Sequence, residues 1–319
     1  MNEEVLAGEV NQQLDFPPKP SINQNGKSSR SFMSAVLFIA AAYFVLDWSV
    51  QQIALIVFVL FVHEFGHYFA MRIFNYKNLG IFFLPFLGAV ATGEKDQVSQ
   101  KQQVIIYLAG PIPGVVIGIV LFLIGSELKN EFLLVAANMF IGLNLFNLIP
   151  VYPFDGGKIL KTLFFESNQV ISFVFLGLSA VGVAFIAYLT ETYAMFLIPI
   201  FLAMQAVTQF QVKKVKEAIV KKGLNLNSSF EQLSNRDYWL IREVIGQHMK
   251  YYTRIIKPKV YEVHEKESQI TKQVKAMLLE TSVADLGWLG KTGVVLIWLM
   301  AFILPLAIVA AKYLLSTGY

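Results

Sequence analysis

The stretch Ile53–Phe74 constrains the fold of this chain more than any other feature of its sequence. Its 22 residues are apolar apart from His63, Glu64 and His67 near the middle, Tyr68 beside them and Arg72 near the end. About 20 consecutive apolar residues are enough for a helix to cross the hydrocarbon core of a bilayer. Charged or titratable side chains are costly at that depth, so their presence indicates a functional site inside a membrane helix.

The composition of the whole chain also favours a membrane protein. Hydrophobic residues make up 55% of the chain and charged residues 15%, whereas soluble domains carry about 25% charged residues. The net charge of +4 is too small to indicate nucleic-acid binding, and the absence of cysteine excludes thiolate metal ligands. We therefore expect an α-helical polytopic membrane protein. Seven stretches approach the length of a transmembrane helix: 31–47, 53–74, 104–125, 132–150, 170–189, 193–212 and 292–315.

Composition shifts divide the chain further. Residues 1–30 are polar and rich in Asn, Gln, Ser and Pro, which is typical of a disordered tail. The membrane domain then covers 31–212. Residues 213–291 carry 15 Lys and Arg against 9 Asp and Glu, and their apolar residues recur at helical spacing. This pattern predicts a small soluble helical domain, followed by a C-terminal transmembrane helix within 292–319.

The apolar segment Leu79–Gly93 does not fit a simple membrane helix. Glycine and proline interrupt it at Gly80, Pro85, Gly88 and Gly93. Non-helical backbone at membrane depth is tolerated only where protein or a water-filled cavity covers it. We therefore expect a re-entrant, β-hairpin-like segment that leans on the helix of the titratable residues, with an apolar surface loop as the alternative.

The distribution of basic residues predicts the orientation. Seven spans place four segments on the same side of the membrane: the N-terminal tail, the loops 75–103 and 155–169, and the domain 213–291. That side should be cytoplasmic because it carries the excess of Lys and Arg. The opposite short loops carry only Lys129. The basic residues on the predicted cytoplasmic side, outside the soluble domain, are Lys19, Lys27, Arg30, Arg72, Lys77, Lys95, Lys101, Lys158 and Lys161.

His63-Glu64-Phe65-Gly66-His67 forms an HExxH motif. Two histidines four residues apart on a helix point the same way and can hold one zinc ion, while the glutamate reaches a water molecule rather than the metal. Zinc in catalytic sites uses three protein ligands plus water, so a third ligand must come from elsewhere in the chain. The alternative is a pair of histidines that bond each other or a neighbouring helix.

Asp155 is the candidate for the third ligand. It follows Pro150 and Pro153, which hold the chain extended, and it precedes Gly156 and Gly157, which permit close backbone approach. The segment can therefore present the carboxylate rigidly near a membrane boundary. Taken alone, Asp155 could equally cap a short helix that begins near Lys158.

Together these elements resemble the site-2 protease family of intramembrane zinc metalloproteases. The family pattern combines HExxH in one membrane helix with Asn-x-x-Pro-x-x-x-x-Asp-Gly at the end of a later one, and here the second element starts at Asn147. Ala109-Gly110-Pro111 is similar to the element that opens the family's middle core helix, and 84–88 is similar to its membrane-embedded β-hairpin. The resemblance covers about 50–165.

The resemblance implies a role for each residue of these motifs. His63, His67 and Asp155 would bind one zinc ion per chain, Glu64 would act as general base, and Asn147 would position the substrate or stabilise the oxyanion. One departure concerns the Asn that often follows Ala-Gly-Pro in the family, because Gly114 stands at that position. The chain shows no room for a PDZ domain or a full-length CBS domain.

The resulting hypothesis is a zinc metalloendopeptidase that cleaves a transmembrane segment of another membrane protein, either to release a regulator or to clear a remnant. We expect it in the cell (inner) membrane of a prokaryote, with the active site towards the cytoplasm. The main alternative is a non-proteolytic membrane zinc protein, such as a transporter or sensor, for which Glu64 would be unnecessary. A scaffold that uses 213–291 for interactions is a third hypothesis, and a protease that trims prenylated termini is disfavoured because that class uses Glu as third ligand.

Overall fold

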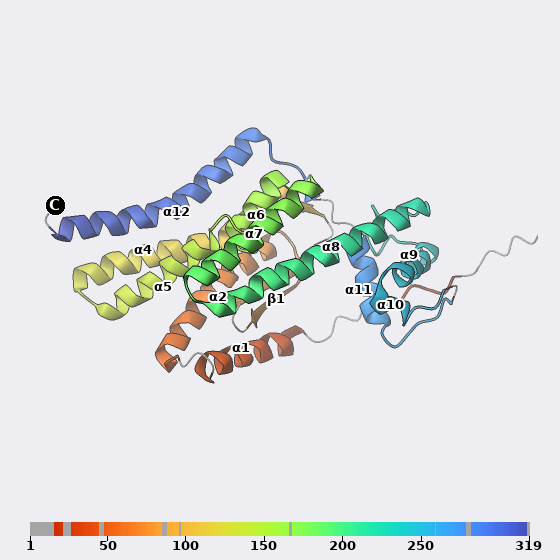
Figure 1. The fold of residues 1–319 in the computed structure, drawn as a ribbon, viewed down its shortest axis with the longest axis horizontal. Helices are drawn as coiled ribbons and strands as arrows, with labels where there is room; N and C mark the ends of the chain where they lie inside the picture. Colours follow the sequence, from red (N-terminus) through yellow and green to blue (C-terminus); the bar gives the residue numbers. More distant parts are fainter. Residues whose placement is uncertain are drawn as a thin grey trace, which may run out of the picture. The chain divides into compact units, whose positions relative to one another are not determined.

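The computed structural model describes residues 16–21, 27–44, 48–84, 88–95, 97–165, 168–258, 260–278 and 282–317 (Figure 1). The chain divides into two compact units. The membrane unit comprises the described residues of 24–208 and 281–319, and the helical unit those of 1–23 and 209–280.

The membrane unit consists of helices, one short β-hairpin and a parallel pair of two-residue strands, β3 and β4. Its helix α8 continues past the boundary into the helical unit. In chain order its elements are α1 (Lys27–Phe44), α2 (Val50–Ile73), β1 (Lys77–Leu84), β2 (Gly88–Glu94), β3 (Val98–Ser99), α3 (Gln100–Ala109), α4 (Pro111–Leu128), α5 (Glu131–Asn147), α6 (Asp155–Leu160), the π-helix η1 (Lys161–Phe165), α7 (Gln169–Leu189), the 3₁₀-helix η2 (Tyr193–Phe196), α8 (Leu197–Lys221), β4 (Ser282–Val283) and α12 (Trp288–Thr317).

Among the described residues, four helical stretches are long and apolar enough to cross a membrane: Val50–Ile73, Gln100–Leu128, Val170–Leu189 and Trp288–Leu315. These correspond to four of the seven predicted spans. The second stretch joins α3 to α4 through Gly110, with Pro111 in the first turn of α4. Most of the apolar surface of the last two stretches is exposed in the isolated chain, as is expected of helices that contact lipid.

The other three predicted spans stay predictions. Helices α1 and α5 are apolar but shorter, over Ser31–Phe44 and Glu131–Asn147. Helix α8 is long, but glutamines and lysines lower its hydropathy. These residues are Gln205, Gln209, Gln211, Lys213 and Lys214.

The predicted hairpin-like segment is an antiparallel hairpin of β1 and β2. Its register places Ile81 opposite Ala91 and Leu84 opposite Gly88, while its tip at 85–87 lies outside the described residues. Helix α1 packs on β1, where the Phe83 amide donates to Ser34 Oγ at 3.0 Å, and α2 lies beside β2. This cover reduces the exposure of the strand edges, which would be costly in lipid.

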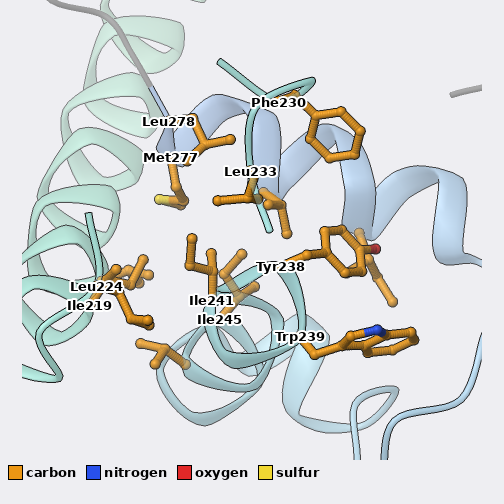
Figure 2. Close-up of a cluster of buried hydrophobic side chains, with 14 of the residues drawn as sticks. Ile219, Leu224, Phe230, Leu233, Tyr238, Trp239, Ile241, Ile245, Met277 and Leu278 are labelled. Atoms are coloured by element: carbon orange, nitrogen blue, oxygen red, sulfur yellow. The ribbon is translucent and has the colours of Figure 1, made fainter. Parts of the chain in front are cut away.

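The helical unit has its own hydrophobic core. The end of α8 packs with α9 (Asn235–His248), α10 (Lys250–Thr253) and α11 (Glu267–Met277). Figure 2 shows the core side chains, among which Tyr238, Trp239, Ile241 and Ile245 of α9 are fully buried. Helical spacing of apolar residues brings these side chains to one face of α9, as the sequence pattern indicates.

The N-terminal tail differs from the expected disorder over residues 16–21. These residues pack on the helical unit, where Phe16 joins its core cluster and Lys19 bonds to backbone oxygens near α9. Their order comes from contacts with residues more than 200 positions away, which local composition does not reveal. Within the tail, residues 1–15 and 22–26 lie outside the described part of the chain, and 27–30 begin α1.

Candidate metal centre

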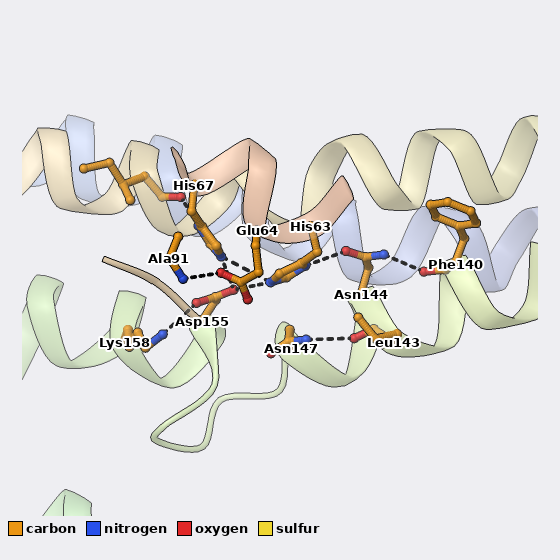
Figure 3. A network of polar contacts seen from close by, with 11 residues as sticks. His63, Glu64, His67, Ala91, Phe140, Leu143, Asn144, Asn147, Asp155 and Lys158 are labelled. Carbon is orange, nitrogen blue, oxygen red and sulfur yellow. Dashed lines mark hydrogen bonds and ion pairs between the residues drawn. The ribbon is translucent and has the colours of Figure 1, made fainter. Parts of the chain in front are cut away.

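Three predicted ligand side chains meet in the membrane unit (Figure 3). Helix α2 supplies His63 and His67, one turn apart on the same face, and the start of α6 supplies Asp155. Oδ2 of Asp155 lies 3.1 Å from Nε2 of each histidine, and the two Nε2 atoms are 3.2 Å apart. All three residues are buried, with exposed fractions of 7% or less.

This arrangement fits a zinc ion. The three residues each offer one ligand atom to a common point. Tetrahedral zinc with bonds of about 2.0–2.1 Å to nitrogen and oxygen separates neighbouring ligand atoms by about 3.4 Å. The observed separations of 3.1–3.2 Å are within a few tenths of an ångström of that value. Two imidazoles and one carboxylate also match the ligand types of catalytic zinc sites.

A buried asparagine fixes the orientation of His63. Nδ1 of His63 lies 2.8 Å from Oδ1 of Asn144, and Nδ2 of Asn144 donates to Phe140 O at 2.7 Å. Because Phe140 O can only accept, the Asn144 amide must present its oxygen to His63. His63 therefore carries its hydrogen on Nδ1 and turns the lone pair of Nε2 towards Asp155.

His67 is held in the same way by the backbone of α3. Its Nδ1 donates to the carbonyl oxygen of Ile106 at 2.7 Å, which leaves the Nε2 lone pair facing the other ligands. Metal-ligating histidines usually donate their second ring N–H to such an acceptor, because the bond fixes both tautomer and ring orientation.

Close helix packing makes these contacts possible. A Cβ on Gly66 would lie 1.9 Å from Ala109 O, so α2 and α3 approach at a distance that only glycine permits. A Cβ on Gly110 would lie 2.3 Å from Nε2 of His67. A Cβ on Gly114 would lie 2.1 Å from Nδ2 of Asn144. The Ala-Gly-Pro element thus brings its helix against the histidines.

Glu64 is held beside the ligand atoms by the hairpin. Its carboxylate oxygen Oε2 accepts a hydrogen bond from the Ala91 amide of β2 at 2.6 Å. The side chain is 5% exposed, and Figure 3 shows its carboxylate next to Asp155 and His63. A buried carboxylate this close to a metal site can take up a proton from a water molecule there.

Asp155 is not the cap of its helix, which overturns that alternative. Helix α6 begins at Asp155 with Phe154 as its N-cap residue. One carboxylate oxygen faces the histidines, and the other accepts from Lys158 Nζ at 3.0 Å. The two glycines that follow lie against the preceding turn, where a Cβ on Gly156 would be 2.1 Å from Leu148 O. The segment thus presents Asp155 through tight backbone packing.

Comparison with known proteins identifies the core that carries this site. Residues 51–130, which contain the two histidines and Glu64, match the family model described as peptidase family M50. The match covers 80 of the 319 residues. The match confirms the resemblance to zinc proteases of the site-2 type, which are membrane proteins.

Two curated proteins are similar to part of this chain. A zinc metalloprotease of Methanocaldococcus jannaschii is 35% identical over 121 residues, which cover 36% of this chain and 34% of that protein. Stage IV sporulation protein FB of Bacillus subtilis is 25% identical over 130 residues, 40% of this chain and 45% of that protein. The similar region therefore spans about a third of the length of the first relative and less than half of the length of the second.

One solved structure is also similar. The site-2 protease from Methanocaldococcus jannaschii aligns with 56% of this chain and 87% of its own, at 23% identity and a TM-score of 0.42.

The remaining candidate, Asn147, has no hydrogen bond to His63, His67 or Asp155 among the described residues. Its Nδ2 donates to Leu143 O of its own helix at 3.1 Å. Its role towards substrate stays a prediction.

The sequence interpretation missed Asn144, Ile106, Ala91 and Lys158. Asn144 could have been found as one of three asparagines on a largely apolar helix, one turn before Asn147. The contacts of Ile106 and Ala91 use backbone atoms, which leave no signal in residue type.

Proposed function

We propose that this chain is an intramembrane zinc metalloendopeptidase that binds one zinc ion and cuts a transmembrane segment of another membrane protein. The observation that carries the proposal is the convergence of His63 and His67 of the apolar helix α2 with Asp155 at the start of α6, with the Glu64 carboxylate beside them. Buried ionisable groups in membrane helices mark functional sites, and a metal alone would not require the glutamate.

The residues of the site divide the work of hydrolysis. Zinc, when bound, lowers the pKa of a water molecule and polarises a carbonyl oxygen. Glu64 takes the proton of the water whose oxygen bonds to the scissile carbonyl carbon. It then gives this proton to the amide nitrogen as the carbon–nitrogen bond breaks. The hydrogen bond from Ala91 keeps the carboxylate aimed at the site during both transfers.

The outer edge of β2 is suited to receive the substrate. Ala91 points its N–H away from β1 and towards Glu64, so the residues two positions away, Ala89 and Gly93, share that edge. A helical substrate hides its peptide bonds and must unwind before cleavage. We infer that the unwound segment adds to this edge as a further strand, as peptides do at exposed sheet edges.

The membrane topology is part of the proposal. We infer seven transmembrane helices in the cell (inner) membrane of a prokaryote, with the site nearer the cytoplasmic face and the soluble domain 213–291 in the cytoplasm. Membrane-impermeant thiol labelling of cysteines placed singly at exposed positions tests this arrangement. Gln97→Cys and Lys272→Cys should react from the cytoplasm and Glu131→Cys from the other side. Labelling of Gln97→Cys and Glu131→Cys from one side would contradict the topology.

Substrate trapping tests the catalytic assignment. Glu64→Gln should keep about one zinc per chain and lose turnover. In native membranes, this variant should stay bound to intact substrate proteins that the wild-type enzyme cleaves and releases. His63→Ala and His67→Ala should lose the zinc itself. Full peptidase activity of Glu64→Gln would refute the mechanism, and zinc flux across the membrane that survives Glu64→Gln would favour a transporter.

A further inference from the structure

Lys19 enters a ring of backbone oxygens on the helical unit. Its Nζ donates to Phe230 O at 2.6 Å, to Glu231 O at 2.9 Å and to Leu233 O at 2.6 Å. Its backbone amide donates to Oδ1 of Asn235 at 3.0 Å. Three acceptors use all three N–H groups of one ammonium, so this turn before α9 is matched to a single lysine.

Aromatic side chains receive the residues that precede Lys19. Nε1 of the fully buried Trp239 donates to Pro17 O at 2.7 Å. The Phe16 ring lies 4.8 Å from the ring of Tyr261, and Nζ of Lys19 lies 5.1 Å from the centre of the Phe230 ring. Figure 2 shows Phe230, Tyr238 and Trp239 in succession along one side of the core. Extended proline-rich segments bind such aromatic surfaces because their conformation is already restricted.

A buried ion pair holds this surface in place. Arg242 donates to both carboxylate oxygens of Glu267, at 2.9 and 3.1 Å, and its guanidinium lies 4.9 Å from the Trp239 ring. Arg242 also donates to the carbonyl oxygens on either side of Tyr261, at 3.4 and 3.1 Å. The tryptophan on α9 and the tyrosine on its loop are therefore positioned by contacts that do not involve residues 16–21.

We propose that the helical unit is a binding module for a short proline-rich protein segment with one lysine, of the type Phe-Pro-Pro-Lys-Pro. Residues 16–21 of the chain occupy this site as an internal ligand, and a partner protein that carries a segment of the same chemistry displaces them. The site is distinct from the metal centre, and the inference does not depend on the proposed peptidase activity.

The contacts explain why the site prefers lysine to arginine and how a partner segment can replace residues 16–21. An ammonium can direct three N–H groups to three oxygens around one point, whereas the planar guanidinium of arginine cannot. Each bond comes from a side chain or backbone atom of a six-residue stretch without helix or strand, so a separate chain can make the same bonds. Attachment in the same chain makes binding of the internal segment intramolecular, which raises its effective concentration above that of a free peptide. A partner therefore binds strongly only when the internal segment is weakened.

Peptide binding to the full-length protein in detergent tests the proposal. The probe is the fluorescein-labelled peptide Phe-Pro-Pro-Lys-Pro-Ser, followed by fluorescence anisotropy. The doubly substituted protein Phe16→Ala/Lys19→Ala should bind it at least ten times more tightly than wild type, because its own segment no longer competes. A second protein variant, Lys19→Arg, keeps the charge and should show the same gain.

Probe variants supply the matched controls. Arginine in place of the probe's lysine should weaken binding at least tenfold, while alanine in place of its serine should not, since Ser21 is exposed. A cooperative thermal unfolding transition in each variant, even at a lower temperature than in wild type, establishes that the helical unit is folded. Failure of both folded variants to bind the probe more tightly than a scrambled peptide would overturn the proposal, as would equal binding of the lysine and arginine probes.

Discussion

The helical unit contains a buried ion pair, and the membrane unit contains a buried cluster of ligand side chains. Only the ion pair is closed, in the sense that each of its charged groups bonds to a protein group of opposite polarity. Arg242 and Glu267 join through two hydrogen bonds, and Tyr238 donates a third to Glu267 at 2.6 Å. Burial and this bond raise the pKa of Tyr238, so it stays a neutral donor. Every charge of this pair faces a complementary protein group.

The membrane cluster leaves its electrostatics incomplete. Both histidines give their Nδ1–H to protein acceptors, so two Nε2 lone pairs face the same carboxylate oxygen at 3.1 Å. Lone pairs and an anion repel one another, and burial strengthens that repulsion. A cation at the centre of the cluster would balance these acceptors. An unbalanced set of acceptors, rather than burial alone, therefore distinguishes a metal site from a structural ion pair.

Removal of Asp155 should have the largest effect. Asp155→Ala deletes the anion and one ligand atom, so we expect loss of bound zinc and of peptidase activity, with the protein still folded in detergent. Zinc content by mass spectrometry of the metal checks this. The matched control is Asn168→Ala, because Asn168 caps α7 and its loss should lower stability by only about 1 kcal/mol. Normal zinc in Asp155→Ala would break the comparison.

Asn144 should have the next largest effect. Asn144→Ala removes the acceptor of His63 Nδ1–H, and loss of such a partner typically lowers metal affinity or activity about 10–100-fold. Competition with a zinc chelator measures the affinity. Asn147→Ala is the matched control, since it sits on the same helix with a bond to that helix's backbone. Equal zinc affinity in both variants would remove Asn144 from the site.

The contrast between these two asparagines shows what sequence could predict. Spacing along one helix predicts His63, Glu64 and His67, because an i, i+4 pair shares a face whatever surrounds it. Asp155 stayed open between ligand and cap, because that choice depends on where α6 begins. Asn144 depends on the space that Gly114 leaves on a neighbouring helix. Docking of residues 16–21 depends on carbonyl oxygens of a distant turn, which no local pattern encodes.

Ala91 should have a moderate effect that leaves the metal in place. Ala91→Pro deletes the N–H that holds Glu64. A general base typically raises the reaction rate about 10²–10⁴-fold. A misdirected Glu64 should lose part of this rate enhancement, so kcat should fall roughly tenfold while the zinc content stays unchanged. Ala89→Pro alters the same strand edge without touching Glu64 and should mainly weaken substrate binding. A similar fall in kcat for both variants would indicate general distortion of the hairpin.

Substitution in the closed ion pair should have the smallest effect on the metal centre. Arg242→Met leaves Glu267 buried without its partner, which typically costs about 3–5 kcal/mol, so the helical unit should unfold at a lower temperature. The double variant Arg242→Met/Glu267→Leu removes both charges and should recover most of this stability. Zinc content should match wild type in both, because the cluster of His63, His67 and Asp155 lies in the other unit. Calorimetry with parallel metal analysis follows both quantities. Loss of zinc in the folded double variant would show that metal binding at the membrane cluster depends on the Arg242–Glu267 ion pair. The two clusters could then no longer be treated as independent.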